Sequence, residues 1–158
     1  MDRSFTAKST RGLLEVLRTP CRVSQAFDPA NGVPEFTITE CDAIWDTGAV
    51  TSVITQRVVD ACGLKPIRTG YVQSVHGVQK TEFYLVNIYL PDKVTFYNLT
   101  VFKGTPPDGW WDMLIGMDII AAGNFSVTNV NSNTEFSFSI PSQPRLSEAT
   151  GSTKSLGL

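Results

Sequence analysis

The sequence contains Ala43-Ile44-Trp45-Asp46-Thr47-Gly48-Ala49, and this stretch decides the fold. The apolar residues before Asp46 predict a buried strand, and Asp46-Thr47-Gly48 predicts a tight turn at its end. A carboxylate in such a place must be paired, hydrogen-bonded or neutralised, so its presence there typically serves chemistry. The alternative is an ordinary loop, because Asp and Gly are common turn residues. The triplet alone does not decide between the two.

The composition favours a single all-β domain. The chain has 158 residues, enough to bury a core without metal or disulfide support. Hydrophobic residues make up 42% and charged residues 18%, and Thr, Val, Phe and Ser are frequent. The formal net charge of −2 gives no electrostatic reason to expect nucleic acid or an anionic membrane as a partner.

The cysteines and the N-terminus indicate a cytoplasmic protein. Cys21, Cys41 and Cys62 are far apart in the sequence and form no CxxC pair, so they predict neither a zinc site nor a disulfide framework. Free thiols suit a reducing compartment. The first residues lack the apolar core of a signal peptide, and no apolar run is as long as a membrane span. We expect no metal and no cofactor.

Residue patterns divide the chain into a polar leader at 1–20, a folded domain at 21–140 and a flexible tail at 141–158. The tail is rich in Ser, Thr, Gly and Pro, which cannot bury enough surface to order it. The best helix candidate runs from Thr55 to Cys62, with Thr55 as its cap and Gly63 as a left-handed stop. Further expected elements are strands around a turn at 75–78, strands at 94–102, 112–116, 125–128 and 134–140, and a short helix at 117–122.

A second motif, Leu114-Ile115-Gly116, follows the first by about seventy positions. Together the two resemble the Asp-Thr-Gly-Ala and hydrophobic-hydrophobic-Gly motifs of the retropepsin-like aspartic proteases, the single-domain branch of that class. The likeness covers roughly residues 36–140. It implies an all-β, single-domain closed barrel with one or two short helices, and an active site at a homodimer interface.

The chemistry of that family requires two carboxylates. One, ionised, takes a proton from water, while the other, protonated, hydrogen-bonds the scissile carbonyl of a peptide. Two carboxylates at hydrogen-bonding distance share one proton, and aspartic proteases are the standard example. Since this chain has one copy of the motif, the resemblance implies a homodimer in which two-fold symmetry brings the two Asp46 residues together.

The resemblance also implies roles for the neighbours of Asp46. Thr47 would hydrogen-bond across the dimer, and Gly48 would support the carboxylate and contact substrate. A hairpin tip would close over an extended peptide, with Ala49 and Ile115 helping to line the pocket walls. The tip residues are Val75, His76 and Gly77. His76 is the only histidine, and a lone His is more often a polar surface residue than a functional one.

Two points remain open in the sequence. Viral members of the family commonly carry acidic residues where Val50 and Thr51 stand, so substrate specificity is not carried over. The strand at 134–140 either lies at the dimer interface or closes the barrel. The alternative function is a catalytically inactive domain of the same fold that dimerises or binds peptides.

Overall fold

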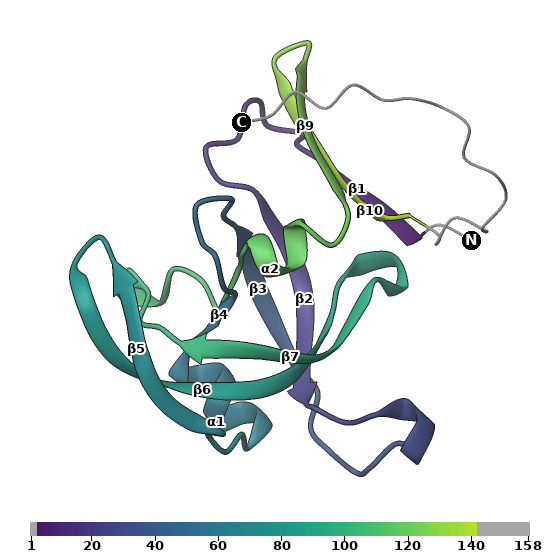
Figure 1. Cartoon of the computed structure of the whole chain (residues 1–158). Helices are drawn as coiled ribbons and strands as arrows, with labels where there is room; N and C mark the ends of the chain where they lie inside the picture. Colours follow the sequence, from purple (N-terminus) through teal and green to yellow (C-terminus); the bar gives the residue numbers. More distant parts are fainter. Residues whose placement is uncertain (1–2, 142–158) are drawn as a thin grey trace, which may run out of the picture.

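The computed structural model describes residues 3–141, which form two β-sheets and two short α-helices (Figure 1). The smaller sheet is antiparallel and lies to one side of the larger one. Its strands, in spatial order, are β1 (Arg3–Lys8), β10 (Asn133–Ile140) and β9 (Asn124–Val130). The expectation of a mostly β protein with one or two short helices is therefore confirmed.

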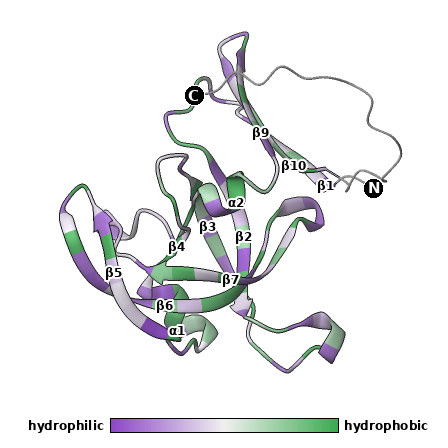
Figure 2. Cartoon of the chain, in the orientation of Figure 1, coloured by the Kyte–Doolittle hydropathy of each residue, from purple (hydrophilic) through white to green (hydrophobic). Residues whose placement is uncertain are grey.

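The larger sheet has seven strands, and a further pairing of β2 with β6 joins distant parts of its order. The pairings thus run from β2 through five other strands and back to β2, with β5 attached outside this ring. In order the strands are β2 (Arg18–Gln25), β3 (Thr39–Trp45), β8 (Met113–Ile115), β4 (Val53–Ile54), β7 (Thr95–Lys103), β6 (Gly77–Tyr89) and β5 (Arg68–Ser74). Buried and exposed residues alternate in β2 and in the first part of β3, whereas β4 and the second half of β6 are buried in consecutive runs. Figure 2 shows hydrophobic residues gathered along these strands.

Both helices form where the sequence patterns predict them, and α1 also has nearly the expected length. Helix α1 (Gln56–Cys62) buries Val58, Val59 and Cys62 and ends at Gly63, whose φ of 60° is left-handed. Thr55 caps α1 through its backbone carbonyl, which accepts from the N–H groups of Val58 and Val59, and its side chain makes no capping bond. Helix α2 (Met117–Ile120) is shorter than expected, and three 3₁₀ turns cover Pro29–Asn31, Pro91–Lys93 and Pro107–Gly109.

Aromatic side chains join the two sheets. Trp45, the last residue of β3, stacks on Phe125 with ring centroids 5.3 Å apart and an interplanar angle of 5°. Its ring also contacts Phe5, Phe136 and Phe138 of the smaller sheet. The indole N–H donates to Thr19 Oγ1 at 2.9 Å, so the polar atom of this buried ring is satisfied. Trp45, the residue directly before Asp46, is therefore held both by the aromatic rings of the smaller sheet and by its hydrogen bond to Thr19.

The N-terminal segment is more structured than a polar leader. Residues Arg3–Lys8 form β1, which pairs with β10 along its whole length, and β2 begins at Arg18. The short strand escaped sequence reasoning because only Phe5 among its residues is buried, and one apolar residue gives no period. The expected tail falls almost entirely at 142–158, outside the described residues.

The cysteines are free and buried, and no helix in residues 3–141 has the length and apolarity needed to cross a bilayer.

Replacing Phe5 by Ala tests whether β1 is an integral part of the fold. Phe5 is buried between Trp45 and Phe138, so Phe5→Ala should lower the free energy of unfolding by about 3 kcal/mol. Chemical denaturation measures the change. Ser4→Ala, an exposed neighbour on the same strand, is the matched control and should shift stability by about 0.5 kcal/mol or less. Equal stability of the two variants would show that residues 1–20 are a dispensable leader.

Candidate active site

Asp46 sits where two parallel strands end together. β3 and β8 pair in parallel, with Trp45 opposite Ile115. The backbone N–H of Asp46 continues this pairing and donates to the Ile115 carbonyl at 2.9 Å. The two motifs of the sequence, some seventy residues apart, are therefore in direct contact. The pairing fixes the backbone from which the carboxylate projects.

The Asp46 carboxylate is held at one oxygen by the turn that follows it. The Gly48 N–H donates to Asp46 Oδ1 at 2.8 Å, and the Ala49 N–H donates to the Asp46 carbonyl at 3.2 Å. Asp46 is half-buried, whereas Thr47 and Gly48 are exposed. The arrangement therefore presents a carboxylate at the molecular surface in an orientation fixed by backbone groups.

Gly116 allows the turn and β8 to approach closely. A Cβ atom on Gly116 would lie 2.9 Å from the carbonyl oxygen of Ala49 and 2.9 Å from the carbonyl carbon of Thr51. Both are backbone atoms, so no side-chain movement could relieve the contact. After Gly116, the Met117 N–H donates to the Ala49 carbonyl at 2.7 Å. The second motif needs Gly because the Asp46 turn packs directly on it.

A side-chain network that sequence reasoning missed joins the same two segments. Asp118 accepts hydrogen bonds from the backbone N–H and the hydroxyl of Ser52, at 2.9 and 2.7 Å. The Ser52 hydroxyl in turn accepts from the Gly116 N–H at 3.0 Å. Ser52 has no exposed surface, so each of its polar groups needs such a partner. The only signal in the sequence is a Ser beside the buried Val53 and Ile54, which does not identify Asp118.

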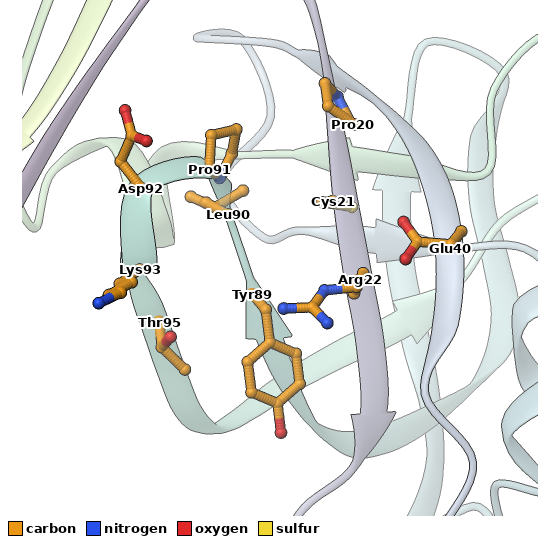
Figure 3. Close-up of a pocket in the computed structure, with 10 residues that line it drawn as sticks. All are labelled: Pro20, Cys21, Arg22, Glu40, Tyr89, Leu90, Pro91, Asp92, Lys93 and Thr95. Atoms are coloured by element: carbon orange, nitrogen blue, oxygen red, sulfur yellow. The ribbon is translucent and has the colours of Figure 1, made fainter.

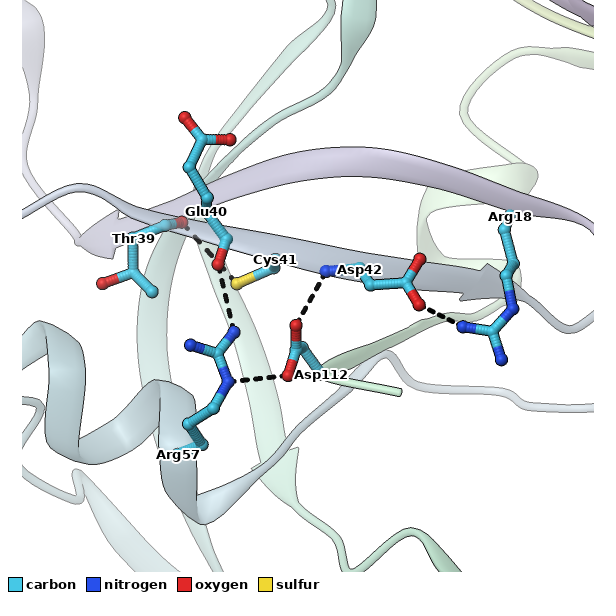
Figure 4. Close-up of polar contacts among 7 residues, drawn as sticks. All are labelled: Arg18, Thr39, Glu40, Cys41, Asp42, Arg57 and Asp112. Carbon is cyan, nitrogen blue, oxygen red and sulfur yellow. Dashed lines mark hydrogen bonds and ion pairs between the residues drawn. The ribbon is translucent and has the colours of Figure 1, made fainter. Parts of the chain in front are cut away.

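A second network fixes the start of β8 (Figure 4). Asp112 accepts from Arg57 Nε at 2.7 Å and from the Asp42 N–H at 2.8 Å, and Arg57 also donates to the Glu40 carbonyl. Burial acts to raise the pKa of Asp112, but these hydrogen bonds and the charge of Arg57 outweigh it and lower the pKa below its ordinary value. Asp42 also pairs with Arg18, which in Figure 4 lies closer to the end of β3 than Arg57 does.

The expected hairpin is formed by β5 and β6, which turn at Ser74 and Gly77. Its tip is open to solvent: Val75 is 96% exposed, and His76 and Gly77 are exposed as well. The Ser74 hydroxyl accepts from the His76 N–H and donates to the Gly77 carbonyl, which holds the turn. The hairpin stands out at one side of the larger sheet (Figure 1). Residues 3–141 therefore leave the apolar side chain of Val75 almost entirely uncovered.

Unlike the other residues predicted to contact substrate, Ile115 has a buried side chain. Its side chain has no exposed surface and packs in the main core, so it offers a peptide nothing but its backbone. Strand alternation places Leu114 on the opposite face of β8, where it is partly exposed and packs beside Val53 and Trp111. Ala49 is half-buried at the turn. Leu114 is thus the β8 side chain with surface available.

Thr47 borders a shallow hollow of about 560 Å³ on the molecular surface. The other walls come from α2 and the start of β9, including Met117, Ala121 and Phe125. The hollow therefore lies between the Asp46 turn and the segment from α2 to the start of β9. Among residues 3–141, no three His, Cys, Asp or Glu side chains are grouped so that they could hold a metal ion.

The fold is similar to solved structures of retropepsin-like aspartic proteases. One is a retropepsin-like aspartic protease from Rickettsia conorii, with 15% identity, a TM-score of 0.52, and coverage of 89% of this chain and 96% of that one. Another is the EIAV protease complexed with the inhibitor HBY-793, with 20% identity, a TM-score of 0.49, and coverage of 72% and 92%. The retroviral protease-like domain of Ddi1 from Leishmania major gives 19% identity, a TM-score of 0.45, and coverage of 78% and 95%. No protein-family model and no curated protein matches the sequence. At these identities the likeness concerns the fold alone.

Removing the Ser52 hydroxyl should loosen the connection between the Asp46 turn and β8. Ser52→Ala leaves the buried Gly116 N–H without an acceptor and takes a donor from Asp118, so the free energy of unfolding should fall by about 1–3 kcal/mol. Urea denaturation measures this change. Ser126→Ala, on exposed strand β9, serves as the control and should leave stability nearly unchanged. If Ser52→Ala lowers the free energy of unfolding no more than Ser126→Ala does, the Ser52–Asp118 network does not stabilise the site.

The Asp112 network should make stability depend on pH. Since the pKa of Asp112 is lowered in the folded state, its stabilisation is complete above the unfolded pKa and is lost as the pH falls through the folded value. Asp112→Asn should therefore cost about 1–2 kcal/mol at neutral pH. The difference in the free energy of unfolding between Asp112→Asn and the wild type should become smaller below about pH 4. Urea denaturation at several pH values tests this, with Asp108→Asn in an exposed turn as control. If the difference in the free energy of unfolding between the variant and the wild type does not change with pH, the proposed role of the Asp112 carboxylate is wrong.

Proposed function

We propose that this protein is an aspartic endopeptidase that hydrolyses peptide bonds with two Asp46 carboxylates, one from each chain of a homodimer. One observation carries the proposal: the half-buried carboxylate of Asp46, held by the Gly48 N–H at the end of two parallel strands. A surface turn with no chemical role would not need the close packing on Gly116 or the buried Ser52–Asp118 network. The retropepsin-like fold supports the same reaction class.

The reaction uses the two carboxylates in different protonation states. The ionised Asp46 takes a proton from a water molecule, which attacks the carbonyl carbon of the scissile bond. The protonated Asp46 of the second chain donates a hydrogen bond to the carbonyl oxygen, where negative charge develops. The proton gained by the first carboxylate is then available to the leaving amine. The Gly48 N–H keeps Asp46 oriented through this cycle.

The dimer follows from stoichiometry and from the surface around the turn. Each chain has one Asp46, so a second copy must supply the second carboxylate. Thr47 is exposed beside the hollow formed with α2 and β9, and a partner's turn would bury both there. In such a dimer Thr47 would bond across the two-fold axis.

The substrate is an extended peptide. A peptide lying between the Asp46 turn and the β5–β6 hairpin would pair as an added strand, since extended chains satisfy their backbone groups in this way. Val75, His76 and Gly77 would close over it, and the 96% exposed Val75 would gain a partner. Ala49 and the partly exposed Leu114 would form the walls, while Ile115 acts through its carbonyl bond to Asp46.

The test of catalysis is Asp46→Asn assayed against a peptide library. The amide is nearly the same size as the carboxyl group but cannot take up the proton, so cleavage should fall by roughly 10³-fold or more while the fold remains. Asp60→Asn, on the exposed side of α1, is the matched control and should cleave as the wild type does. Cleavage that persists in Asp46→Asn would overturn the proposed role.

Mixing the two proteins tests the shared site. If each active site needs an Asp46 from both chains, excess Asp46→Asn should lower activity more steeply than dilution alone, because mixed dimers are inactive. A folded, dimeric wild type that cleaves nothing in the library would instead favour the inactive dimerisation or peptide-binding domain.

A further inference from the structure

We propose that Cys21 and Cys41 form a reversible disulfide when the protein meets a peroxide, and that this bond staples β2 to β3. The two residues lie directly opposite each other in the antiparallel pairing of these strands. Residues opposed in this way point to the same face, so their thiols project into the same part of the core. Both are free, and they are 3% and 5% exposed.

The backbone geometry already suits the bond. Opposed residues of an antiparallel pair have Cα atoms about 4.5–5.5 Å apart, within the range that disulfides span without backbone movement. Adjacent pairs hold this register on both sides, with Pro20 opposite Asp42 and Arg22 opposite Glu40. Closing the bond therefore requires side-chain rotation rather than a new strand alignment.

The two thiols differ in reactivity. The Cys21 thiol donates to Met113 Sδ at 3.8 Å and the Cys41 thiol to the Thr39 carbonyl at 3.6 Å. The nearby Cys21 thiol, aided by the charge of Arg57, lowers the pKa of the Cys41 thiol against the opposing effect of burial. The same contact with Cys41, together with burial, raises the pKa of Cys21. Cys41 therefore supplies the thiolate, and Cys21 is the resolving thiol. Figure 4 shows Cys41 on β3 close to Arg57.

The oxidation balances with hydrogen peroxide as the oxidant. The Cys41 thiolate attacks one peroxide oxygen, the O–O bond breaks, and the leaving hydroxide takes up a proton to become water. The Cys21 sulfur then attacks the Cys41 sulfenic sulfur; the S–O bond breaks, the S–S bond forms, and the departing hydroxide leaves as water with the Cys21 proton. Each cysteine sulfur loses one electron and peroxide gains two.

A surface cavity brings a small oxidant as far as Cys21, directly opposite Cys41. The cavity, of about 440 Å³, lies between β2 and the turn after β6, and Cys21 forms part of its wall (Figure 3). Arg22 and Tyr89 line the same cavity beside it. Cys62, on α1, is also near Cys41, and its thiol donates to the Val23 carbonyl at 3.3 Å. The strand pairing sets Cys21 and Cys41, and not Cys62, directly opposite each other, so this is the pair placed to form a disulfide.

The disulfide should stabilise the fold without moving Asp46. It would close the segment between Cys21 and Cys41, which includes the long connection with the 3₁₀ turn at Pro29–Asn31. A closed loop of this length should raise the melting temperature by roughly 5–10 °C. Because the register of β3 is unchanged, the Asp46 turn keeps its place at the end of that strand.

The experiment treats the full-length protein with a small excess of hydrogen peroxide, blocks remaining thiols in denaturant and maps the digest by mass spectrometry. The expected result is a linked pair of peptides containing Cys21 and Cys41, with Cys62 alkylated, and a raised melting temperature that returns to its starting value with dithiothreitol. A disulfide involving Cys62, a bond between chains, irreversible oxidation, or three alkylated cysteines would each overturn the proposal.

Two variants sharpen the result. Cys41→Ala should lose the peroxide-dependent rise in melting temperature, whereas the matched control Cys62→Ala, equally buried, should keep it. Mapping the wild-type protein decides the proposal even if Cys41→Ala does not fold. Since neither readout uses peptide cleavage, the result is independent of the proposed protease activity.

Discussion

The parallel pairing of β3 with β8 is the constraint on which the rest of the structure depends. It brings Asp46 and Gly116 together through the bond from the Asp46 N–H to the Ile115 carbonyl. Parallel strands cannot be joined by a tight turn, so the chain between them must make a long excursion. That excursion forms β4, α1 and the β5–β6–β7 strands. The position of the carboxylate and the course of the chain are thus consequences of one pairing.

Polar groups secure both ends of the short strand β8. At its start, Asp112 is held by Arg57 and by the Asp42 backbone, in a partly exposed position. Beyond its end, Asp118 is held by the buried Ser52. Three residues of β-structure alone provide few ladder hydrogen bonds, so these contacts add rigidity to the strand that supports Asp46.

In the proposed dimer the Asp46 site is half of a catalytic arrangement, and three features of its surface are consistent with that proposal. One Asp46 oxygen is bound by a single backbone N–H, Thr47 is exposed beside a hollow, and the apolar tip residue Val75 is uncovered. These features have a common explanation if a second copy and an extended peptide complete the site. The likeness to the Rickettsia conorii structure supports the fold on which this proposal rests. Cys41 lies in β3, the strand leading to Asp46, and Cys21 lies opposite it in β2, so a bond between them would brace the same support.

The sequence by itself determined those elements that are set by residues close together in the chain. The helix ending at Gly63, the hairpin turning at Gly77, the strand before Asp46 and the mostly β composition follow from nearest-neighbour patterns, and the two motifs indicated the retropepsin-like fold. The tertiary structure decided what depends on distant partners. It placed β1 beside β10, paired Ser52 with Asp118, and buried Ile115 while leaving Leu114 partly exposed. Contacts between residues more than sixty positions apart leave no periodic mark in a single sequence, because each partner looks like an ordinary residue until the fold brings the two together.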